Sequence, residues 1–268
     1  MKSKITVLLL VTVSVMTVMG SSITRAATYK VPSDYKTIQD ALYGKVTDGD
    51  TIMVEPGKYS GDGFRDLIFP FVVIHLTSEA GAAGTSINVE GDAETNHRFA
   101  AIGSDNGPSE GSTIEGFTFT GGYESWNAGA IIYDYGTSTT IRNCIFRDNV
   151  GGAYQGIYFE GTIANCTFLN NYMPTGEEVD GKGGAMQLLY SAGTVTGCTF
   201  EGNTSDMNGG ALYSRESSTT ISNCTFDGNS TSTGGALYTY GSGLQVTGCL
   251  FINNAVGGYG GAIAIDGY

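Results

Sequence analysis

Hydrophobic residues along most of the chain fall in short blocks whose parity changes within each block. In one block, Ile221 falls on one parity, whereas Cys224 and Phe226 fall on the other. A straight strand cannot place all three on one face, because its side chains alternate with period 2. A bend at Asn223 removes the conflict, since Asn and Gly tolerate left-handed backbone geometry. The pattern therefore predicts two short strands joined at a bend, with all three apolar side chains facing one core.

This block recurs along the chain as a repeat. Six segments align without gaps: Ile114–Gly122, Ile141–Asn149, Ile163–Asn171, Val195–Asn203, Ile221–Asn229 and Val246–Asn254. Between them runs a Gly-Gly-Ala signature that begins at Gly151, Gly183, Gly209, Gly234 and Gly260. A unit of roughly 25 residues with variable inserts is typical of a solenoid.

Each unit supplies three short strands, one from the Gly-Gly-Ala segment and two from the bent block. Stacked at ~4.8 Å, such units form a parallel β-helix, and the crossover preference makes it right-handed. We expect one asparagine per coil to form a hydrogen-bonded ladder, namely Asn149, Asn171, Asn203, Asn229 and Asn254. A leucine-rich repeat is the rival solenoid, but its leucine spacing and helix-forming half are missing here.

Cysteine occurs once per coil, at Cys144, Cys166, Cys198, Cys224 and Cys249. The odd number and the common repeat position favour a buried column of small side chains over a disulfide framework, although adjacent coils could still form a single bridge.

The segment at 27–113 precedes the regular repeats at 114–268 and predicts an N-terminal cap followed by the first coils. Thr37 has capping-box spacing and opens a short helix through about Tyr43. Strands are expected at Thr51–Val54 and Phe71–Leu76, and the helix can cover the open solenoid end. Because the sequence stops inside a repeat, we expect the β-helix to continue in a longer protein.

Residues 1–26 have the pattern of a signal peptide. A cationic head precedes an uncharged apolar run from Ile5 to Met19, and small residues follow. Cleavage is expected after Ala26, with Ser22 as the alternative. The run is shorter than the ~20 residues that span a bilayer, so an uncleaved anchor is less favoured. We therefore expect a secreted or cell-surface protein, with no membrane span after cleavage.

The mature chain is strongly acidic. All 26 acidic residues follow the signal, whereas the 13 basic residues lose Lys2, Lys4 and Arg25, which leaves a net charge near −16. Such a charge repels nucleic acid and anionic membranes, and it disfavours unaided binding of polyanionic glycans.

Two stretches resemble known families. Lys36–Leu42 with Asp48–Tyr59 is similar to the opening of pectin-lyase-like β-helix proteins, and the later repeats resemble those of polymorphic outer membrane proteins. The first resemblance implies the fold, and the second implies surface display and adhesion. Lyases on this scaffold use an Arg or Lys base beside acidic calcium ligands, and hydrolases use close aspartates.

No catalytic residue is assigned from the sequence. The repeats offer Arg142, Arg147, Lys182 and Arg215, and no two of these fall at the same point of adjacent coils, so surface roles are favoured. No cofactor is expected apart from calcium. Calcium could be held by Glu177, Glu178 and Asp180 in the longest insert, but their spacing matches no calcium loop, and a solvated acidic loop is the simpler interpretation. Glu90, Asp92 and Glu94 invite the same two interpretations.

Tyrosines provide the candidate binding surface. Tyr213 and Tyr238 lie two residues after the repeat alanine, beside inward leucines, so both should face outward and be exposed. Tyr133, Tyr190 and Tyr240 are expected on the same side, and so is Tyr154. Such a stripe could bind an extracellular glycan or a protein of a host or neighbouring cell, or it could only shield the sheet. The sequence thus favours a non-catalytic adhesin or binding stalk, with a pectate-lyase-like polysaccharide lyase as the alternative.

Overall fold

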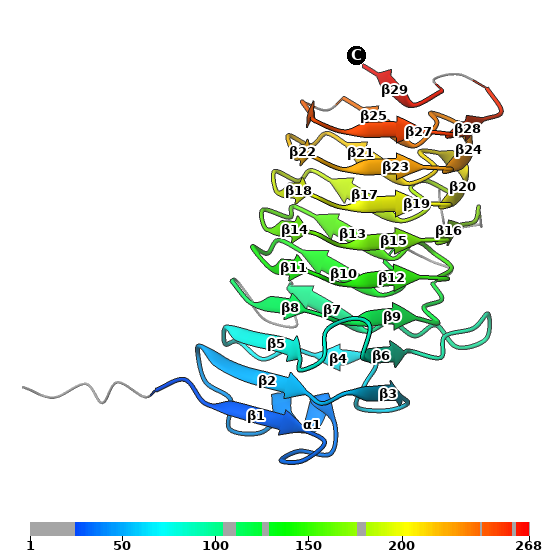
Figure 1. Cartoon of the computed structure of the whole chain (residues 1–268). Coiled ribbons are helices and arrows are strands. Elements are labelled where there is room, and N and C mark those ends of the chain that lie inside the picture. The colour runs from blue at the N-terminus through cyan, green and yellow to red at the C-terminus, as the bar shows by residue number, and fades with distance from the viewer. Residues whose placement is uncertain are drawn as a thin grey trace, which may run out of the picture.

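The computed structural model describes residues 25–103, 111–124, 129–175, 181–241, 243–258 and 261–267. Its coils stack along one axis to form a parallel β-helix (Figure 1). Every strand pair in the sheets is parallel, and identical repeat positions are directly opposite one another, as in Ile163 with Val195 and Phe168 with Phe200. The predicted coil geometry and repeat register are therefore confirmed.

Three sheets run the length of the described structure. Sheet A contains β1 (Thr28–Val31), β2 (Asp50–Val54), β5 (Ile74–Ser78), β8 (Thr113–Glu115), β11 (Thr140–Arg142), β14 (Thr162–Ala164), β18 (Thr194–Thr196), β22 (Thr220–Ser222) and β26 (Gln245–Thr247). Sheet B contains β3 (Gly57–Ser60), β6 (Thr85–Asn88), β9 (Thr118–Thr120), β12 (Ile145–Arg147), β15 (Thr167–Leu169), β19 (Thr199–Glu201), β23 (Thr225–Asp227) and β27 (Leu250–Ile252). Sheet C contains β4 (Leu67–Ile68), β7 (Ala100–Gly103), β10 (Ile132–Tyr135), β13 (Tyr154–Ile157), β17 (Met186–Leu189), β21 (Leu212–Arg215), β25 (Leu237–Tyr240) and β29 (Ile263–Asp266).

The later coils add a fourth strand that the sequence did not predict. Sheet D contains β16 (Tyr172–Met173), β20 (Thr204–Asn208), β24 (Ser230–Thr233) and β28 (Ala255–Val256). These strands lie between sheets B and C, and most of their side chains are polar. Without a hydrophobic alternation they cannot be distinguished from loops in the sequence, and only pairing between adjacent coils makes them strands.

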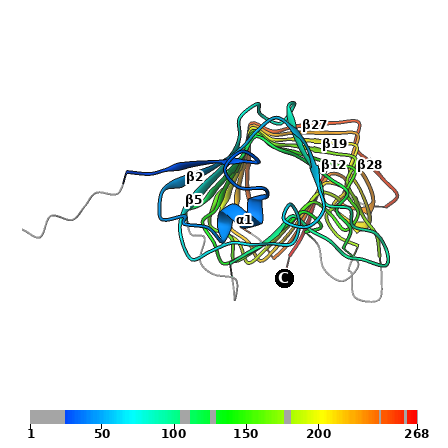
Figure 2. The same ribbon diagram turned by 90° about the horizontal axis from the view of Figure 1, so that it is seen from below.

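The N-terminal cap is formed by α1 (Ile38–Leu42), which lies across the end of the coils (Figure 2). Thr37 caps the helix by accepting a hydrogen bond from the Asp40 N–H, as its sequence position predicts. The strand expected at Phe71–Leu76 was placed too early: β5 begins at Ile74, and Phe71, which follows Pro70, is 71% exposed.

The bends between sheets A and B confirm the parity argument. The residues at this corner all have positive φ: Asn143, Asn165, Gly197, Asn223 and Gly248. The first glycine of the Gly-Gly-Ala signature has a related role. Gly209 has φ of 69°, and a Cβ there would collide with the Leu212 carbonyl oxygen, so only glycine fits without displacing the next strand.

The core consists of columns of like side chains. Phenylalanine rings of successive coils stack almost parallel, with centroids 4.8 Å apart between Phe168 and Phe200 and 4.7 Å apart between Phe200 and Phe226. Four of the five cysteines are buried beside this column and all five are free thiols, which confirms the cysteine column over a disulfide framework.

The predicted asparagine ladder is present at the corner after sheet B. Asn203 accepts hydrogen bonds from the backbone and side-chain N–H groups of Asn171, both at 2.9 Å. Its own amide donates to Asn229 Oδ1 and to the Phe168 carbonyl, also at 2.9 Å. These bonds lie inside the fold, so they satisfy backbone groups that water cannot reach.

One polar pair lies unexpectedly among the apolar columns. Tyr154 follows the repeat alanine directly, so it takes the inward leucine position and is buried, contrary to its expected place on the surface. Its hydroxyl donates to Asp134 at 3.2 Å, and Thr137 donates to the same carboxyl group at 2.6 Å. Burial raises the pKa of Asp134 to about 7, and these two hydrogen bonds only partly oppose that rise.

Replacing Asn203 by alanine should destabilise the β-helix strongly. The change leaves the Phe168 carbonyl and the Asn171 N–H groups without their ladder partner, which should lower the free energy of unfolding by about 3–5 kcal/mol. Urea unfolding of Asn203→Ala and of a surface control, Glu201→Ala, measures the effect. A loss of the same size in both variants would contradict it.

Asp134 should make stability dependent on pH. The folded state holds its proton up to about pH 7. The unfolded state loses that proton near pH 4, so stability should fall as pH rises from about 4 to about 7. Asp134→Asn should remove this component and be more stable than the wild type at pH 8, by up to the order of 4 kcal/mol. Parallel pH profiles of unfolding free energy for the two proteins would refute this.

Candidate functional site

The outer face of sheet C carries two columns of side chains in register between coils. Leu212 and Leu237 point into the core, whereas their neighbours Tyr213 and Tyr238 lie opposite one another on the outside. Two residues further on, Arg215 pairs in register with Tyr240 and Tyr240 with Asp266. The outward direction of the repeat tyrosines is therefore confirmed.

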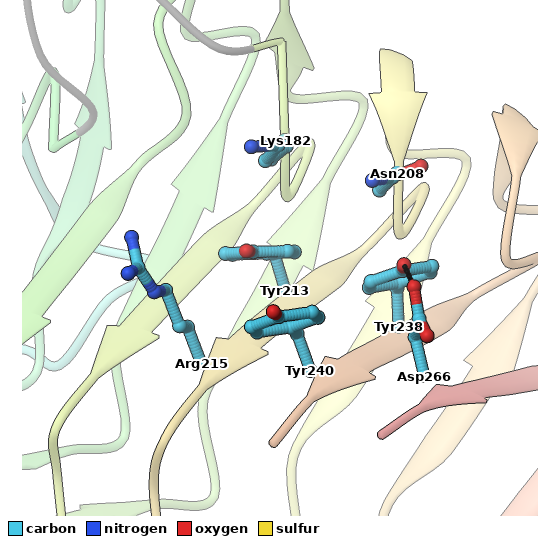
Figure 3. Close-up of a pocket in the computed structure, with 7 residues that line it drawn as sticks. All are labelled: Lys182, Asn208, Tyr213, Arg215, Tyr238, Tyr240 and Asp266. Carbon is cyan, nitrogen blue, oxygen red and sulfur yellow. Dashed lines mark hydrogen bonds between the residues drawn. The ribbon is translucent and has the colours of Figure 1, made fainter. Parts of the chain in front are cut away.

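These columns border a surface cavity of about 320 Å³, the sheet C groove. Strands β21, β25 and β29 form its floor, and the segments that lead into sheet C form its wall (Figure 3). Its lining comprises Lys182, Asn208, Tyr213, Arg215, Tyr238, Tyr240 and Asp266.

Tyr213 and Tyr238 are less exposed than expected. Their rings stack with centroids 5.8 Å apart and an angle of 15°, and the side chains are only 6% and 9% exposed. The Lys182 ammonium lies over the Tyr213 ring, 5.4 Å from its centroid. The expected exposure of these two residues was wrong, because neighbouring coils and the preceding segment cover the ring faces. The ring faces therefore contact each other and Lys182, and they are not open to a ligand.

The other predicted tyrosines occupy different parts of the same face. Tyr240 lines the groove. Tyr190 follows β17 in left-handed conformation, is 37% exposed, and lies under the Arg215 guanidinium at 5.6 Å. Tyr133 is separated from the groove by two further coils. Of the five candidate tyrosines, three therefore line the groove, Tyr190 lies at its edge beside Arg215, and Tyr133 lies apart from it.

Two glutamines fill the outer column between Tyr133 and Tyr213. Gln155 donates to Gln187 at 2.9 Å, and Gln187 donates to the Lys182 carbonyl at 2.6 Å. Both side chains are buried, and among the described residues Gln155 Oε1 has no hydrogen-bond partner. Neither glutamine was predicted from the sequence as part of this surface, although both follow the repeat alanine at the same distance as Tyr213.

The groove combines charges of both signs. Lys182 and Arg215 come from adjacent coils and line one cavity, although they do not share a repeat position. The insert before β17 brings Lys182 over the strand that holds Arg215, which repeat spacing alone does not reveal. Asp266 accepts a hydrogen bond from the Tyr238 hydroxyl at 2.9 Å. Burial, and next this hydrogen bond, raise the pKa of Tyr238 to about 12.

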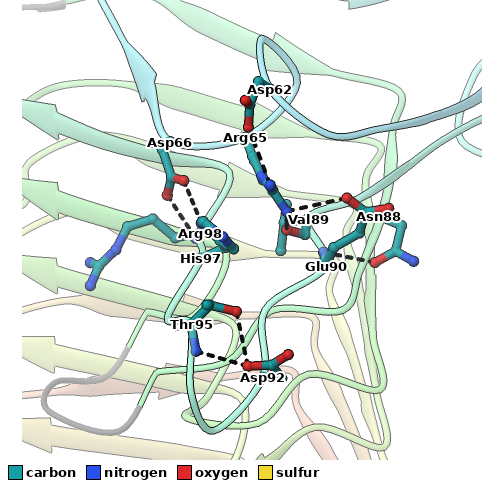
Figure 4. A network of polar contacts seen from close by, with 10 residues as sticks. All are labelled: Asp62, Arg65, Asp66, Asn88, Val89, Glu90, Asp92, Thr95, His97 and Arg98. Atoms are coloured by element: carbon teal, nitrogen blue, oxygen red, sulfur yellow. Dashed lines mark hydrogen bonds and ion pairs between the residues drawn. The ribbon is translucent and has the colours of Figure 1, made fainter.

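A second polar cluster includes Asp66, His97 and Arg98 (Figure 4). His97 contacts Asp66 at 2.6 Å, Arg98 pairs with Glu124, and the Arg98 guanidinium lies 5.5 Å from the Tyr133 ring centroid. The acidic residues considered for calcium are engaged here as well. Glu90 pairs with Arg65 at 3.2 Å, and Asp92 accepts three hydrogen bonds within its own loop.

The main calcium candidates, Glu177, Glu178 and Asp180, lie outside the described residues. In the part of the chain that is described, no three metal-ligating side chains of the His, Cys, Asp or Glu type come together. Across the same residues, no helix is long and apolar enough to cross a bilayer.

Comparison with known proteins places the chain at the level of its fold. A family described as "Right handed beta helix region" matches residues 85–267. A pectin methylesterase from carrot is similar in structure, with 12% identity and a TM-score of 0.48 over 91% of this chain and 88% of that one. A pectin methylesterase in complex with a hexasaccharide has 14% identity and a TM-score of 0.38 over 80% of each chain. Sequence identity and structural similarity at this level say nothing about whether this chain catalyses the same reaction. No curated protein matches significantly.

The contact between Tyr238 and Asp266 should be visible in an alkaline titration. The difference in ultraviolet absorbance between wild type and Tyr238→Phe isolates one phenol, which should titrate near pH 12. In Asp266→Asn, the same phenol should titrate closer to the ordinary value of about 10. An unchanged midpoint in Asp266→Asn would contradict the hydrogen bond.

Proposed function

This chain belongs to the right-handed β-helix family, and we propose that it is a secreted or cell-surface protein that binds an extracellular glycan through the sheet C groove without cleaving it. The observation that carries the proposal is the lining of the groove, where phenol, amide, cationic and carboxylate groups converge over adjacent coils. A polyhydroxylated ligand needs many donors and acceptors held in fixed positions, and a rigid sheet supplies them.

The geometry favours an extended chain molecule as the ligand. Equivalent side chains recur with every coil at ~4.8 Å, so one subsite follows another along the axis. A tyrosine hydroxyl can hydrogen-bond to a sugar hydroxyl, and the edge of a tyrosine ring can pack against the apolar face of a sugar ring. Gln155 and Gln187 continue this outer column beyond the groove.

Charge favours a neutral glycan over a polyanion. The two cations of the groove, Lys182 and Arg215, already contact the tyrosine rings Tyr213 and Tyr190. The mature chain as a whole carries a net charge near −16. Long-range repulsion would therefore oppose polyuronates, especially at low salt. The resemblance of the repeats to polymorphic outer membrane proteins supports display at a cell surface, where a neighbouring cell's glycans would be the partner.

A polysaccharide lyase is the competing function, and one observation favours it. Lys182 and Arg215 lie in one groove beside Asp266, which provides a candidate base and a carboxylate near one substrate position. A lyase of this kind would also need a group that neutralises the uronic carboxylate, a role in which calcium is the natural ion.

Glycan binding should depend on the groove and not on exposed tyrosines in general. We expect Arg215→Ala and Tyr240→Ala each to weaken binding of an oligosaccharide selected on a glycan array about tenfold, a loss of about 1–2 kcal/mol. Tyr43→Ala is the matched control, because Tyr43 is 64% exposed but lies on the cap, away from the groove. The affinity of this variant for the oligosaccharide should equal that of the wild type.

The same protein should be incubated with neutral and uronic-acid polymers in the presence of calcium. Binding without new chain ends supports the proposal. Release of unsaturated uronides that is lost in Arg215→Ala would replace it with the lyase function. Absence of any ligand on the array would reject both.

A further inference from the structure

The start of the described chain is tied to a buried carboxylate. Ala27 directly precedes β1, the outermost strand of sheet A, and its backbone N–H donates to Asp50 Oδ1 at 2.7 Å. The other oxygen of Asp50 accepts from the Thr47 N–H at 2.7 Å and from the Thr47 hydroxyl at 3.0 Å. Asp50 is only 2% exposed. Among the described residues, the donors to this carboxylate are amide and hydroxyl groups, and none of them is cationic.

The chain before Ala27 fits a processing site. Arg25 and Ala26 are exposed and lie outside any strand or helix, so a peptidase can reach the bond after Ala26. Thr24 and Ala26 are small residues separated by one position, as leader peptidases require at the end of a signal peptide. The residue that would become the new N-terminus is therefore the one whose nitrogen already contacts Asp50.

We propose that hydrolysis of the bond between Ala26 and Ala27 creates an α-ammonium group that forms a buried ion pair with Asp50 and locks the first strand onto the β-helix. Water supplies the hydroxyl group of the new Ala26 carboxyl and one hydrogen of the Ala27 amine. The amine then takes a further proton from solvent, because its ordinary pKa is about 7.7–8.0.

The charge state of Asp50 suits this role. Burial alone would raise its pKa, but the hydrogen bonds from Ala27 and Thr47 outweigh burial and hold the pKa below its usual value. The carboxylate is therefore ionised at neutral pH while shielded from water. An ammonium partner replaces a neutral hydrogen bond by a charge-assisted one, which is about twice as strong. Strand β1 is paired on one side only, so a tether at its start limits fraying.

Four proteins test the ion pair directly. Two start positions, Ala27 and Thr24, are each combined with wild-type Asp50 and with Asp50→Asn. All four proteins are released from a fusion by cleavage. At about pH 6.5, where the α-amino group is charged, the Ala27 form of the wild type should melt roughly 2–6 °C above the Thr24 form. In Asp50→Asn, which retains an acceptor without the charge, this gap should vanish. An equal gap in both backgrounds, or no gap in the wild type, would overturn the proposal.

Two further measurements apply even if Asp50→Asn does not fold. Acetylating the Ala27 amine retains an N–H but removes the charge, so the acetylated wild type should melt with the Thr24 form. A melting temperature equal to that of the unmodified Ala27 form would refute the ion pair. Intact mass of the protein exported with its own leader should place the first residue at Ala27, and a chain that begins at Ile23 would refute the processing site.

Discussion

Stacking of each coil on the next, with equivalent residues opposite one another, is the constraint on which the rest of this structure depends. No coil can bury its apolar residues alone, because three short strands enclose too little volume. The phenylalanine column and the asparagine ladder resist a slip in register for different reasons. The rings of Phe168, Phe200 and Phe226 stack in that order, with neighbouring centroids 4.7–4.8 Å apart. The asparagines pair buried amide groups that would otherwise lack hydrogen-bond partners.

The same constraint organises the outer surface. Once the inner side chains stack, their outward neighbours form columns as well, so a groove on sheet C can extend over several coils. Variation enters through the inserts between sheets B and C. The segment before β17 places Lys182 against Tyr213, and sheet D pairs the following inserts with one another. The rigid repeats thus hold the floor of the groove, and the inserts determine its wall and its charge.

The buried carboxyl groups of Asp134 and Asp50 lie where the repeat is interrupted or has not yet begun. Asp134 and Tyr154 replace apolar residues within the core, and Asp50 secures the first strand before regular stacking begins. In each case a buried carboxyl group is held by hydrogen bonds, but the outcome differs. Asp134 has two hydroxyl donors and its pKa rises, whereas Asp50 has two backbone donors and a hydroxyl and its pKa falls. The balance between burial, which favours the protonated form, and hydrogen bonds, which favour the carboxylate, decides which form is stable: burial dominates at Asp134 and the hydrogen bonds dominate at Asp50.

The sequence by itself determined the coil, because a period of two defines which side chains face inward and a bend residue with positive φ resets that parity. The cysteine column, the asparagine ladder and the outward direction of Tyr213 and Tyr238 all follow from this rule. Exposure did not follow from it, since the cover over those two rings comes from other coils and from Lys182. The gathering of Lys182 with Arg215, the polar strands of sheet D and the contact between Ala27 and Asp50 were decided by the tertiary structure alone. They depend on where inserts of unequal length lie in space, and no local period encodes that position.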